Sequence, residues 1–435
     1  MLRSAMRAGI WQGRPPAGTG SGNGGPWLME VRRGNPPRAL QTQAPDVSTA
    51  PGASGLPPEV HFAQLRAQCP VALQAGSGTN GAGRAAWVLT RYDDIVAAAN
   101  DPETFGQSQR FAGERRPPLE SNPPEHRIWR RMLQPYFLPK AINQMEPFTR
   151  ALARDLLAPI LATGSGDAAH GVARPLPPQI LLRWLGQPSE DWETIKLACE
   201  HAYFQGSPDP AERAAFEEAE ALLWRYARDT VASRIERGTH EADDDPVSAM
   251  LAAMPTEPAV TRPLIDGVVR LLLAAGHDST TSALGMCIGF VAGDGDLQQS
   301  LRSDPTRIPA AIEEMLRLRT PVLQMPRTVM ADTVVGGREL AAGDSVLLAF
   351  ASGNRDASAF ENAECFDMGR RSGQHIAFGV GIHRCIGNIL ARQEIRVVLE
   401  ELLAATCSFR PDGDIEHEFW HPYGLRRLPL SLVPR

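Results

Sequence analysis

The chain has 435 residues, of which 43% are hydrophobic and 22% are charged, and its formal net charge at pH 7 is −6. This composition is that of an ordinary globular protein with enough apolar residues for a large core. The chain carries no basic excess of the kind that nucleic-acid-binding proteins use, and we found no apolar run of the ~18 residues that cross a membrane. We therefore expect no nucleic-acid partner and no membrane insertion.

The N-terminal segment differs in composition from the rest of the chain. It is rich in glycine and proline, as in "GRPPAGTGSGNGGP". Such a segment buries little apolar surface, so we expect residues 1–55 to form a disordered tail. Its opening "MLRSAMRAGI" has arginines and no acidic residue, a faint likeness to a transit peptide. We prefer the alternative, a plain flexible tail with Met29 as a second candidate start.

From about residue 57 onward the sequence predicts mostly helices. A short strand and a helix are expected in "AAWVLTRYDDIVAAAND", and a helix with many basic residues in "EHRIWRRMLQPYF". Apolar residues at 3–4 spacing predict a long amphipathic helix in "AERAAFEEAEALLWRYARDTVASRIER". Residues 263–293 predict one longer helix, which is apolar around much of its circumference and should therefore be buried.

The C-terminal part adds two helices and a few strands. "IPAAIEEMLRLRTP" predicts a helix that ends at Pro321. Alternating residues and a Gly-Gly turn in "RTVMADTVVGGRELAAGDSVLLAFASGNRD" predict a small antiparallel sheet. A helix is expected in "IGNILARQEIRVVLEELLAA", followed by short strands. With no fixed-period repeat and no βαβ alternation in the sequence, we expect a mainly α fold with small β sheets in a single domain, residues 56–435.

The six cysteines are scattered and contain no CxxC pair. This pattern favours reduced thiols in a cytoplasmic protein over a disulfide framework. Cys385 is the exception, because it lies in "HIAFGVGIHRCIGN". The glycines there permit a tight turn, and a helix expected from about Ile386 places a partial positive charge near the sulfur. Both features favour a thiolate.

A thiolate at Cys385 suits iron as an axial ligand. No second Cys or His lies at the spacing that a zinc site needs. Two other uses stay open from the residues alone: a buried apolar filler, or a nucleophile paired with His383.

The ten residues "FGVGIHRCIG", 378–387, resemble the haem-ligand loop of the cytochrome P450 family, FGxGxHxCxG, at all six fixed positions. Three further motifs resemble the family in order and spacing, and the resemblance covers roughly residues 57–435, with the length of the soluble bacterial class. It implies a single-domain triangular helical prism with a buried haem b. It also implies that the loop contacts the haem through Phe378, Gly379, His383, Cys385 and Gly387, with Cys385 as the metal ligand.

The second motif is "EMLR", in which Glu314 and Arg317 face each other at i, i+3 on a predicted helix. Taken alone, they would be a surface ion pair worth under ~1 kcal/mol. The resemblance implies instead a buried structural ion pair behind the haem loop, joined by a third basic residue. Cys365 occupies the position where the family commonly has that residue. Either the network is incomplete, or another residue such as Arg355 takes part.

The third motif is "AAGHDSTT", residues 274–281, within the predicted buried helix. Asp278 and Ser279 place an acid and an alcohol in an apolar element, which is costly unless they are paired or functional. The alternative is a helix kink solvated by Ser and Thr side chains. The resemblance implies a catalytic pair that relays protons to the site where dioxygen is reduced. Ser279 replaces the usual Thr, Thr280 is the second candidate alcohol, and Ala275 is expected beside the haem.

The fourth group consists of basic residues suited to carboxylates. His126 and Arg130 share a helix face at i, i+4. The resemblance implies that these two side chains, together with Arg327 and His383, bind the haem propionates. Taken singly, each could be an ordinary solvated basic residue.

Together, the motifs imply a haem-thiolate monooxygenase that uses dioxygen to hydroxylate or dealkylate a small organic molecule. A mainly apolar substrate is expected from the candidate pocket residues Ala274, Val322, Leu323 and Met325. No stretch resembles a flavin or ferredoxin module, so we expect an external ferredoxin and an NAD(P)H-dependent ferredoxin reductase.

Arginines expected on the proximal side could attract such an acidic partner, or form a generic solvated face. They are Arg131, Arg384 and Arg392. A peroxide-driven haem-thiolate enzyme and a non-catalytic haem-binding sensor are the alternative functions.

Overall fold

The computed structural model describes residues 46–47, 56–74, 85–108, 114–205, 207, 209–237, 245–371, 373–418 and 422–435. Every described residue belongs to one compact unit, Ala44–Arg435. The tail expected over residues 1–55 lies outside the described residues, apart from the two-residue strand β1 (Asp46–Val47). The predicted boundary at residue 56 therefore stays a prediction.

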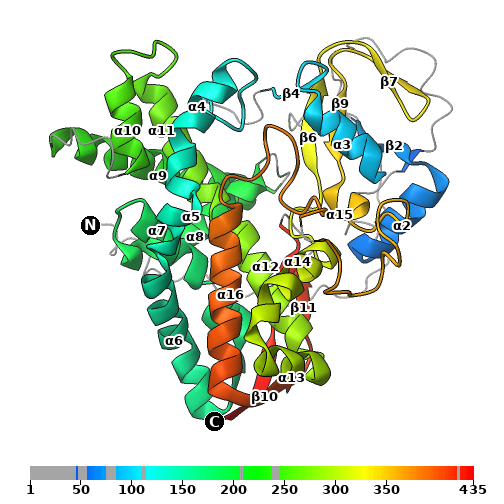
Figure 1. Ribbon diagram of the computed structural model, residues 1–435. Helices are drawn as coiled ribbons and strands as arrows, with labels where there is room; N and C mark the ends of the chain where they lie inside the picture. The colour runs from blue at the N-terminus through cyan, green and yellow to red at the C-terminus, as the bar shows by residue number, and fades with distance from the viewer. Residues whose placement is uncertain are drawn as a thin grey trace. The chain divides into compact units, whose positions relative to one another are not determined.

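Helix α16 (Asn388–Ala405) is at the centre of the helical part (Figure 1). It packs against α6 (Glu146–Thr163), α12 (Asp278–Ala292) and α14 (Ile308–Leu318). Its buried residues recur at helical spacing, which explains why this segment forms a helix among other helices. These apolar side chains are Leu390, Ile395, Val397, Val398, Leu399, Leu402 and Leu403.

The other helices surround this group or cover the sheets. They are α2 (Pro58–Gln68), α3 (Tyr92–Asn100), α4 (Glu125–Leu133), α5 (Pro139–Asn143), α7 (Leu176–Trp184), α8 (Trp192–His201), α9 (Pro210–Glu236), α10 (Pro246–Ala253), α11 (Arg262–Ala275), α13 (Gly295–Ser303) and α15 (Phe350–Gly353). No helix in the described ranges is long and apolar enough to cross a membrane.

Six strands form the largest sheet, in the order β1-β2-β3-β9-β6-β4. Its further members are β2 (Val71–Gln74), β3 (Ala86–Leu89), β4 (Phe105–Gly106), β6 (Met325–Val329) and β9 (Ser345–Leu348). The C-terminal part was predicted to form an antiparallel sheet, and the antiparallel pairing of β6 with β9 confirms this prediction. The prediction was incomplete, because β9 also pairs in parallel with β3 from the N-terminal part.

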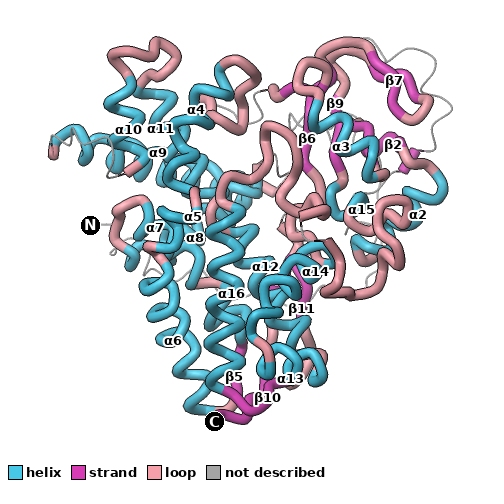
Figure 2. Tube along the Cα trace, viewed as in Figure 1, coloured by secondary structure: helices cyan, strands magenta, loops and turns pink. Residues whose placement is uncertain are grey.

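Three small sheets complete the fold. The Gly-Gly hairpin joins β7 (Thr333–Val335) to β8 (Arg338–Leu340), as predicted. The short C-terminal strands are β10 (Thr406–Pro411), β11 (Glu416–Glu418), β12 (Gly424–Arg427) and β13 (Pro429–Pro434), and β13 also pairs with β5 (Ser165–Asp167). Figure 2 shows few strands among many helices, so the predicted mainly α fold with small sheets is confirmed.

The single helix predicted over residues 263–293 was wrong in one respect. The chain forms two helices there, α11 and α12, which are separated at Gly276 and His277. A Cβ on Gly276 would lie 2.7 Å from a methyl carbon of Leu181, so α7 packs directly on the break. His277 has φ −129° and ψ −41°, outside the helical region, and α12 starts anew at Asp278.

Candidate functional site

Cys385 lies in a loop that two glycines bend and a backbone hydrogen bond closes. Gly379 and Gly381 have φ values of 70° and 75°, which favour glycine. A Cβ on Gly381 would lie 2.1 Å from the carbonyl oxygen of Ala99, so the loop packs directly against the end of α3. The N–H of Cys385 donates to the carbonyl of Phe378 at 2.8 Å. The chain thus holds the cysteine in a fixed turn.

Cys385 is an exposed residue, although protein atoms surround its thiol. Burial raises the pKa of this thiol, and the backbone N–H of Gly387 acts in the opposite direction. Three guanidinium groups also favour the thiolate, those of Arg130, Arg392 and Arg384. Helix α16 begins at Asn388, slightly later than the start predicted near Ile386. The sulfur therefore lies just ahead of the helix, among hydrogen-bond donors and positive charges.

Three of the predicted propionate-binding residues gather beside this sulfur. His126 and Arg130 lie one turn apart on α4, and the ring centroids of His126 and His383 are 4.4 Å apart. The charge of Arg130 interacts with Cys385. Burial, with Arg130 and Arg127 nearby, lowers the pKa of His126 to about 4, so its imidazole is neutral at pH 7. Its buried Nε2 has no hydrogen-bond partner among the described residues.

The remaining predicted binding residues lie on β6, in the segment between α14 and β6, and at the helix break. Arg327 is buried on β6 and donates from Nη1 to the carbonyl of Pro326 at 2.8 Å. Leu323 is buried in an apolar cluster that includes Phe62 and Met286. The other four differ in exposure: Ala275 is exposed, whereas Ala274, Val322 and Met325 are half-buried. Their contacts with a substrate or a haem stay predictions.

Asp278 is buried at the start of α12 and forms an ion pair that the sequence analysis missed. Its Oδ1 accepts a short hydrogen bond from Nζ of Lys196, a residue of α8, and the two side chains are 4% and 5% exposed. His277 Nδ1 lies 3.3 Å from the same oxygen. Burial would raise the pKa of Asp278, but His277 and Lys196 lower it below its ordinary value. The other oxygen, Oδ2, has no hydrogen-bond partner among the described residues.

The hydroxyl groups after Asp278 differ in their surroundings. Ser279 is half-buried and Thr280 is buried, and neither hydroxyl donates to or accepts from another described residue. Thr281 Oγ1 is buried and also has no hydrogen-bond partner within the described ranges. Free hydroxyl groups beside a carboxylate can bind water or a substrate group.

A second buried charge lies six residues before the break. Arg270 of α11 is fully buried and donates from Nη2 to Oε1 of Glu220 on α9. Glu220 also accepts from Nη2 of Arg116 at 2.8 Å. The Nε and Nη1 atoms of Arg270 have no partner in the part of the chain that the structure describes. Charged groups with open hydrogen-bonding positions therefore accumulate along α11 and the start of α12.

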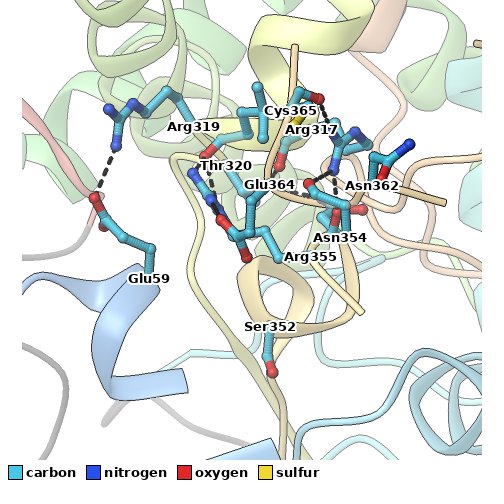
Figure 3. Close-up of polar contacts among 12 residues, drawn as sticks. Glu59, Arg317, Arg319, Thr320, Ser352, Asn354, Arg355, Asn362, Glu364 and Cys365 are labelled. Carbon is cyan, nitrogen blue, oxygen red and sulfur yellow. Dashed lines mark hydrogen bonds and ion pairs between the residues drawn. The ribbon is translucent and has the colours of Figure 1, made fainter. Parts of the chain in front are cut away.

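Glu314 and Arg317 form a buried ion pair, which excludes the simpler reading of a surface pair. Arg317 donates from Nε to Oε2 of Glu314 at 2.8 Å and from Nη2 to Oε1 at 2.6 Å, and the side chains are 2% and 4% exposed. Figure 3 shows the same guanidinium near Asn354 and Cys365, whose carbonyl oxygens accept at 2.8 and 3.0 Å. Cys365 thus contributes only its backbone to this network.

The third basic residue is Arg370, which the sequence analysis did not find. Its Nε donates to Oε1 of Glu314 at 2.9 Å. The suggested substitute, Arg355, was wrong, because its guanidinium pairs with Glu364 (Figure 3). The same guanidinium donates to the carbonyl of Leu318. Arg370 lies only five residues after Cys365, so a search for arginines following the missing position could have found it.

Comparisons with known proteins agree on the family. Residues 213–425 match the sequence profile described as Cytochrome P450. Cytochrome P450 109 of Bacillus spizizenii is 30% identical over 360 residues, which is 80% of this chain and 87% of that protein. Linalool 8-monooxygenase of Pseudomonas putida is 29% identical over 395 residues, or 86% of this chain and 95% of that protein.

The structural comparison leads to the same conclusion. CYP109E1 of Bacillus megaterium, solved in complex with testosterone, superposes with a TM-score of 0.76 at 26% identity and covers 86% of this chain and 97% of that one. Fold and relatives define the class of a haem-dependent monooxygenase. The chain belongs to the cytochrome P450 family.

The residues around Cys385 fit the haem that this family implies. Cys385 is an exposed residue whose sulfur has a backbone N–H and positive charges beside it, which suit a thiolate ligand of iron. The buried Nε2 of His126 is available to an acceptor, and Arg130 has no ion pair with a carboxylate among the described residues. A group that carries both iron and carboxylates would use all three. The described residues contain no cluster of three or more His, Cys, Asp or Glu side chains that could hold a metal ion instead.

Proposed function

We propose that this protein hydroxylates or dealkylates a mainly apolar small organic molecule with dioxygen, and that Cys385 is the thiolate ligand of a haem b. Haem with a thiolate ligand supplies the activation of dioxygen and the transfer of one oxygen atom. One observation carries the proposal. Cys385 is an exposed residue, its sulfur accepts from the N–H of Gly387, and it lies within the field of three arginines. A cysteine that merely filled the core would be buried and apolar.

The basic residues would hold the two carboxylates of the haem. Arg130 supplies charge, and neutral His126 supplies a hydrogen-bonding nitrogen that has no other partner among the described residues. We assign His383 and Arg327 to the same task, His383 because its ring meets that of His126. Charge-assisted hydrogen bonds to carboxylates are the physical basis of these assignments. Phe378, Gly379, Gly387 and Ala275 would pack against the ring.

Asp278, Ser279 and Thr280 would manage protons. The lowered pKa of Asp278 keeps its carboxylate ionised at pH 7, so at rest it acts as a hydrogen-bond acceptor for water and hydroxyl groups. Ser279 and Thr280 carry hydroxyl groups with no partner among the described residues, and each can both donate and accept. Asp278 would orient water and a neighbouring hydroxyl, and that hydroxyl would pass a proton toward the substrate side.

The substrate class rests on the pocket residues and on relatives. Ala274, Val322, Leu323 and Met325 offer apolar surface without a charge. By its name, the Pseudomonas putida relative oxidises linalool, and the Bacillus megaterium structure holds testosterone. Both support a small, mainly apolar molecule for this chain.

We further propose that a separate ferredoxin and an NAD(P)H-dependent ferredoxin reductase deliver the electrons. Two of the three arginines expected to attract an acidic partner are exposed, Arg384 and Arg131. The Arg131 side chain is 74% exposed, although it also pairs with Glu257 at 3.5 Å. Arg392 is less available, because its side chain is 25% exposed and pairs with Glu313 at 2.6 Å. A cytoplasmic location, expected from the scattered cysteines, stays a prediction, although all six are free in the structure.

The spectrum of the reduced protein with carbon monoxide tests the iron ligand. A thiolate ligand moves the Soret band far to the red, and we expect this band in the wild type and its loss in Cys385→Ala. Cys365→Ala is the matched control, because that exposed cysteine contributes only its carbonyl to a contact. A red-shifted band that persists in Cys385→Ala would contradict the proposal.

A reconstitution assay tests the electron source. We expect substrate oxidation with ferredoxin, reductase and NAD(P)H. Comparable turnover with hydrogen peroxide alone would favour a peroxide-driven enzyme instead.

A further inference from the structure

Glu313, the residue before Glu314, is the centre of a second charged network that the sequence motifs did not reveal. Its Oε1 accepts from Nε of Arg392 at 2.6 Å, and its Oε2 accepts from Nη2 of the same guanidinium at 2.9 Å. His375 Nε2 lies 3.0 Å from Oε2. The side chains of Glu313 and His375 are only 16% and 4% exposed. A two-point pairing of this kind fixes both the position and the plane of the guanidinium.

The protonation state of this network follows from its hydrogen bonds. The backbone N–H of Ala377 donates to Nδ1 of His375 at 3.2 Å, so in the neutral ring the proton is on Nε2 and is donated to Glu313. Burial would raise the pKa of Glu313, but the bonds from His375 and Arg392 outweigh it and lower the value to about 2. Glu313 is therefore a carboxylate throughout the working pH range.

The network reaches the cysteine loop from two directions. The Arg392 guanidinium lies 4.3 Å from the ring centroid of Phe378, the residue whose carbonyl accepts from the N–H of Cys385. Arg392 Nη1 also donates to the side-chain oxygen of Asn388 at 2.7 Å, and Asn388 Nδ2 donates to the carbonyl of Cys385 at 2.7 Å. Two short chains of contacts thus run from Glu313 to both ends of the turn that holds the sulfur.

The same network sets part of the electric field at the sulfur. The charge of Arg392 favours the thiolate of Cys385. The carboxylate of Glu313 offsets that charge at hydrogen-bonding distance, so the pair as a whole acts on the sulfur much less than the guanidinium alone would. A change that removes only the carboxylate charge therefore leaves a net positive charge behind the loop.

We infer that Glu313 is a positioning residue which, through Arg392 and His375, fixes the Cys385 loop and limits the positive charge that acts on its sulfur. This inference rests on the proposed role of Cys385 as the haem ligand. It differs from the role of Glu314, whose partners Arg317 and Arg370 bind backbone carbonyls away from the loop. Outer groups that orient a metal ligand commonly tune the metal in this way.

The test compares Glu313→Gln with Glu146→Gln in the full-length, haem-loaded protein. Glu146 is the matched control because its carboxylate also pairs with an arginine of α16, Arg396, at 2.6 Å. We expect Glu313→Gln to bind haem, to have a higher midpoint reduction potential than the wild type, and to lose the red-shifted carbon monoxide band several-fold faster on incubation. A positive charge left near the iron stabilises the added electron, which explains the direction of the potential shift. Glu146→Gln is expected to leave both properties unchanged.

A second variant separates position from charge and covers the case in which Glu313→Gln does not fold. Arg392→Lys keeps the positive charge but loses the two-point pairing, so it should lose the red-shifted band faster with a smaller shift in potential. If the variants that fold match the wild type in both measurements, the inference is wrong. If the wild type itself lacks the red-shifted band, the proposed haem ligand is wrong, and the two failures are thereby distinguished.

Discussion

Two groups of buried charges in this molecule differ in how completely they are paired. The first, which we call the cysteine network, consists of Glu313 and Arg392, which reach the Cys385 loop, and of the neighbouring Glu314, Arg317 and Arg370. Both oxygens of each of its carboxylates accept hydrogen bonds from arginines. The second, the helix-break cluster, consists of Lys196, Glu220, Arg270, His277 and Asp278. Its atoms without a partner among the described residues are Asp278 Oδ2, His277 Nε2, and Arg270 Nε and Nη1.

The difference indicates what each group is for. A fully paired network in a low-dielectric interior is rigid, and a change in any member leaves another charge uncompensated. Open hydrogen-bonding positions in the interior cost free energy and persist where water or a reacting group uses them. The cysteine network therefore suits a fixed support, and the helix-break cluster suits a place where polar partners are exchanged.

The largest expected effect is loss of the carboxylate of Glu314. Glu314→Ala leaves the guanidinium of Arg317, which is 2% exposed, without its two-point partner. Breaking a buried pair in this way costs about 3–5 kcal/mol. Chemical denaturation measures this loss of free energy of unfolding. Glu59→Ala is the control, because Glu59 pairs with the half-exposed Arg319 nearby (Figure 3). Loss of that pair should cost under ~1 kcal/mol. If Glu314→Ala and Glu59→Ala lose the same free energy of unfolding, the buried pair contributes no more to stability than the half-exposed one.

The next effect concerns turnover rather than stability. Asp278→Asn removes the charge of the proposed proton-transfer group, and such groups contribute on the order of 100-fold or more to rate. We expect substrate oxidation to fall by about 100-fold, with a larger solvent isotope effect than in the wild type. Asp294→Asn is the control, because Asp294 also precedes a helix and accepts from the N–H of Leu297. Unchanged turnover in Asp278→Asn would show that the helix-break cluster is structural.

One buried acid on α16 lies outside both groups, and its charge is not paired within the described ranges. Glu394 is 1% exposed, and its Oε2 has no hydrogen-bond partner among the described residues, although it shares the helix with Arg392. Burial raises its pKa well above the ordinary 4.5. The unfolded chain therefore releases this proton more readily than the folded one, and Glu394 lowers the free energy of unfolding increasingly as the pH rises above 4.5. Glu394→Gln should raise the free energy of unfolding at pH 7 by at least about 1 kcal/mol. A destabilised variant would indicate that the acid has a partner or a task.

The smallest expected effect is the pH dependence of the pair between Lys196 and Asp278. The pKa of Asp278 is lowered from 3.8, so its contribution to stability is complete above pH 3.8 and is lost as the pH falls through the folded-state pKa. The pKa of Lys196 is raised from 10.5, so its contribution is complete below pH 10.5 and is lost as the pH rises through the folded-state value. Between pH 7 and pH 3 the wild type should lose about 1 kcal/mol more than the double variant Lys196→Met/Asp278→Asn.

Denaturation curves at the two pH values measure this difference. Identical losses in the two proteins would mean that the pair contributes nothing that depends on the charge of Asp278.

The sequence predicted those parts of the site in which the interacting residues lie close together in the chain. The turn around Cys385 follows from its glycines, and the pairing of Glu314 with Arg317 follows from their helical spacing. The break at Gly276 was foreseen only as a kink, the alternative to the catalytic pair, because apolar periodicity continues through it; in the structure the close approach of Leu181 marks it. Periodicity describes one segment at a time and does not include the neighbours that bend it.

Partners from distant segments were missed for the same reason. Lys196 lies on the buried face of α8 with Ile195 and Cys199, a position that is costly for a lysine unless it is paired. That signal was present in the sequence, but nothing in it identifies Asp278 as the partner. Nothing in the sequence indicated a partner for Arg392. It was expected on a surface and is instead paired with Glu313.

The pairing of β3 with β9 has a consequence for how the chain folds during synthesis. Trp87 pairs with Val346, which lies more than half the chain later, whereas β2 and β3 can form a hairpin as soon as they leave the ribosome. Until β9 is synthesised, the other edge of β3 has no strand beside it, and exposed strand edges promote aggregation. Contacts of such long sequence separation also form slowly. We therefore expect the yield of folded protein to depend on the rate of translation and on chaperones.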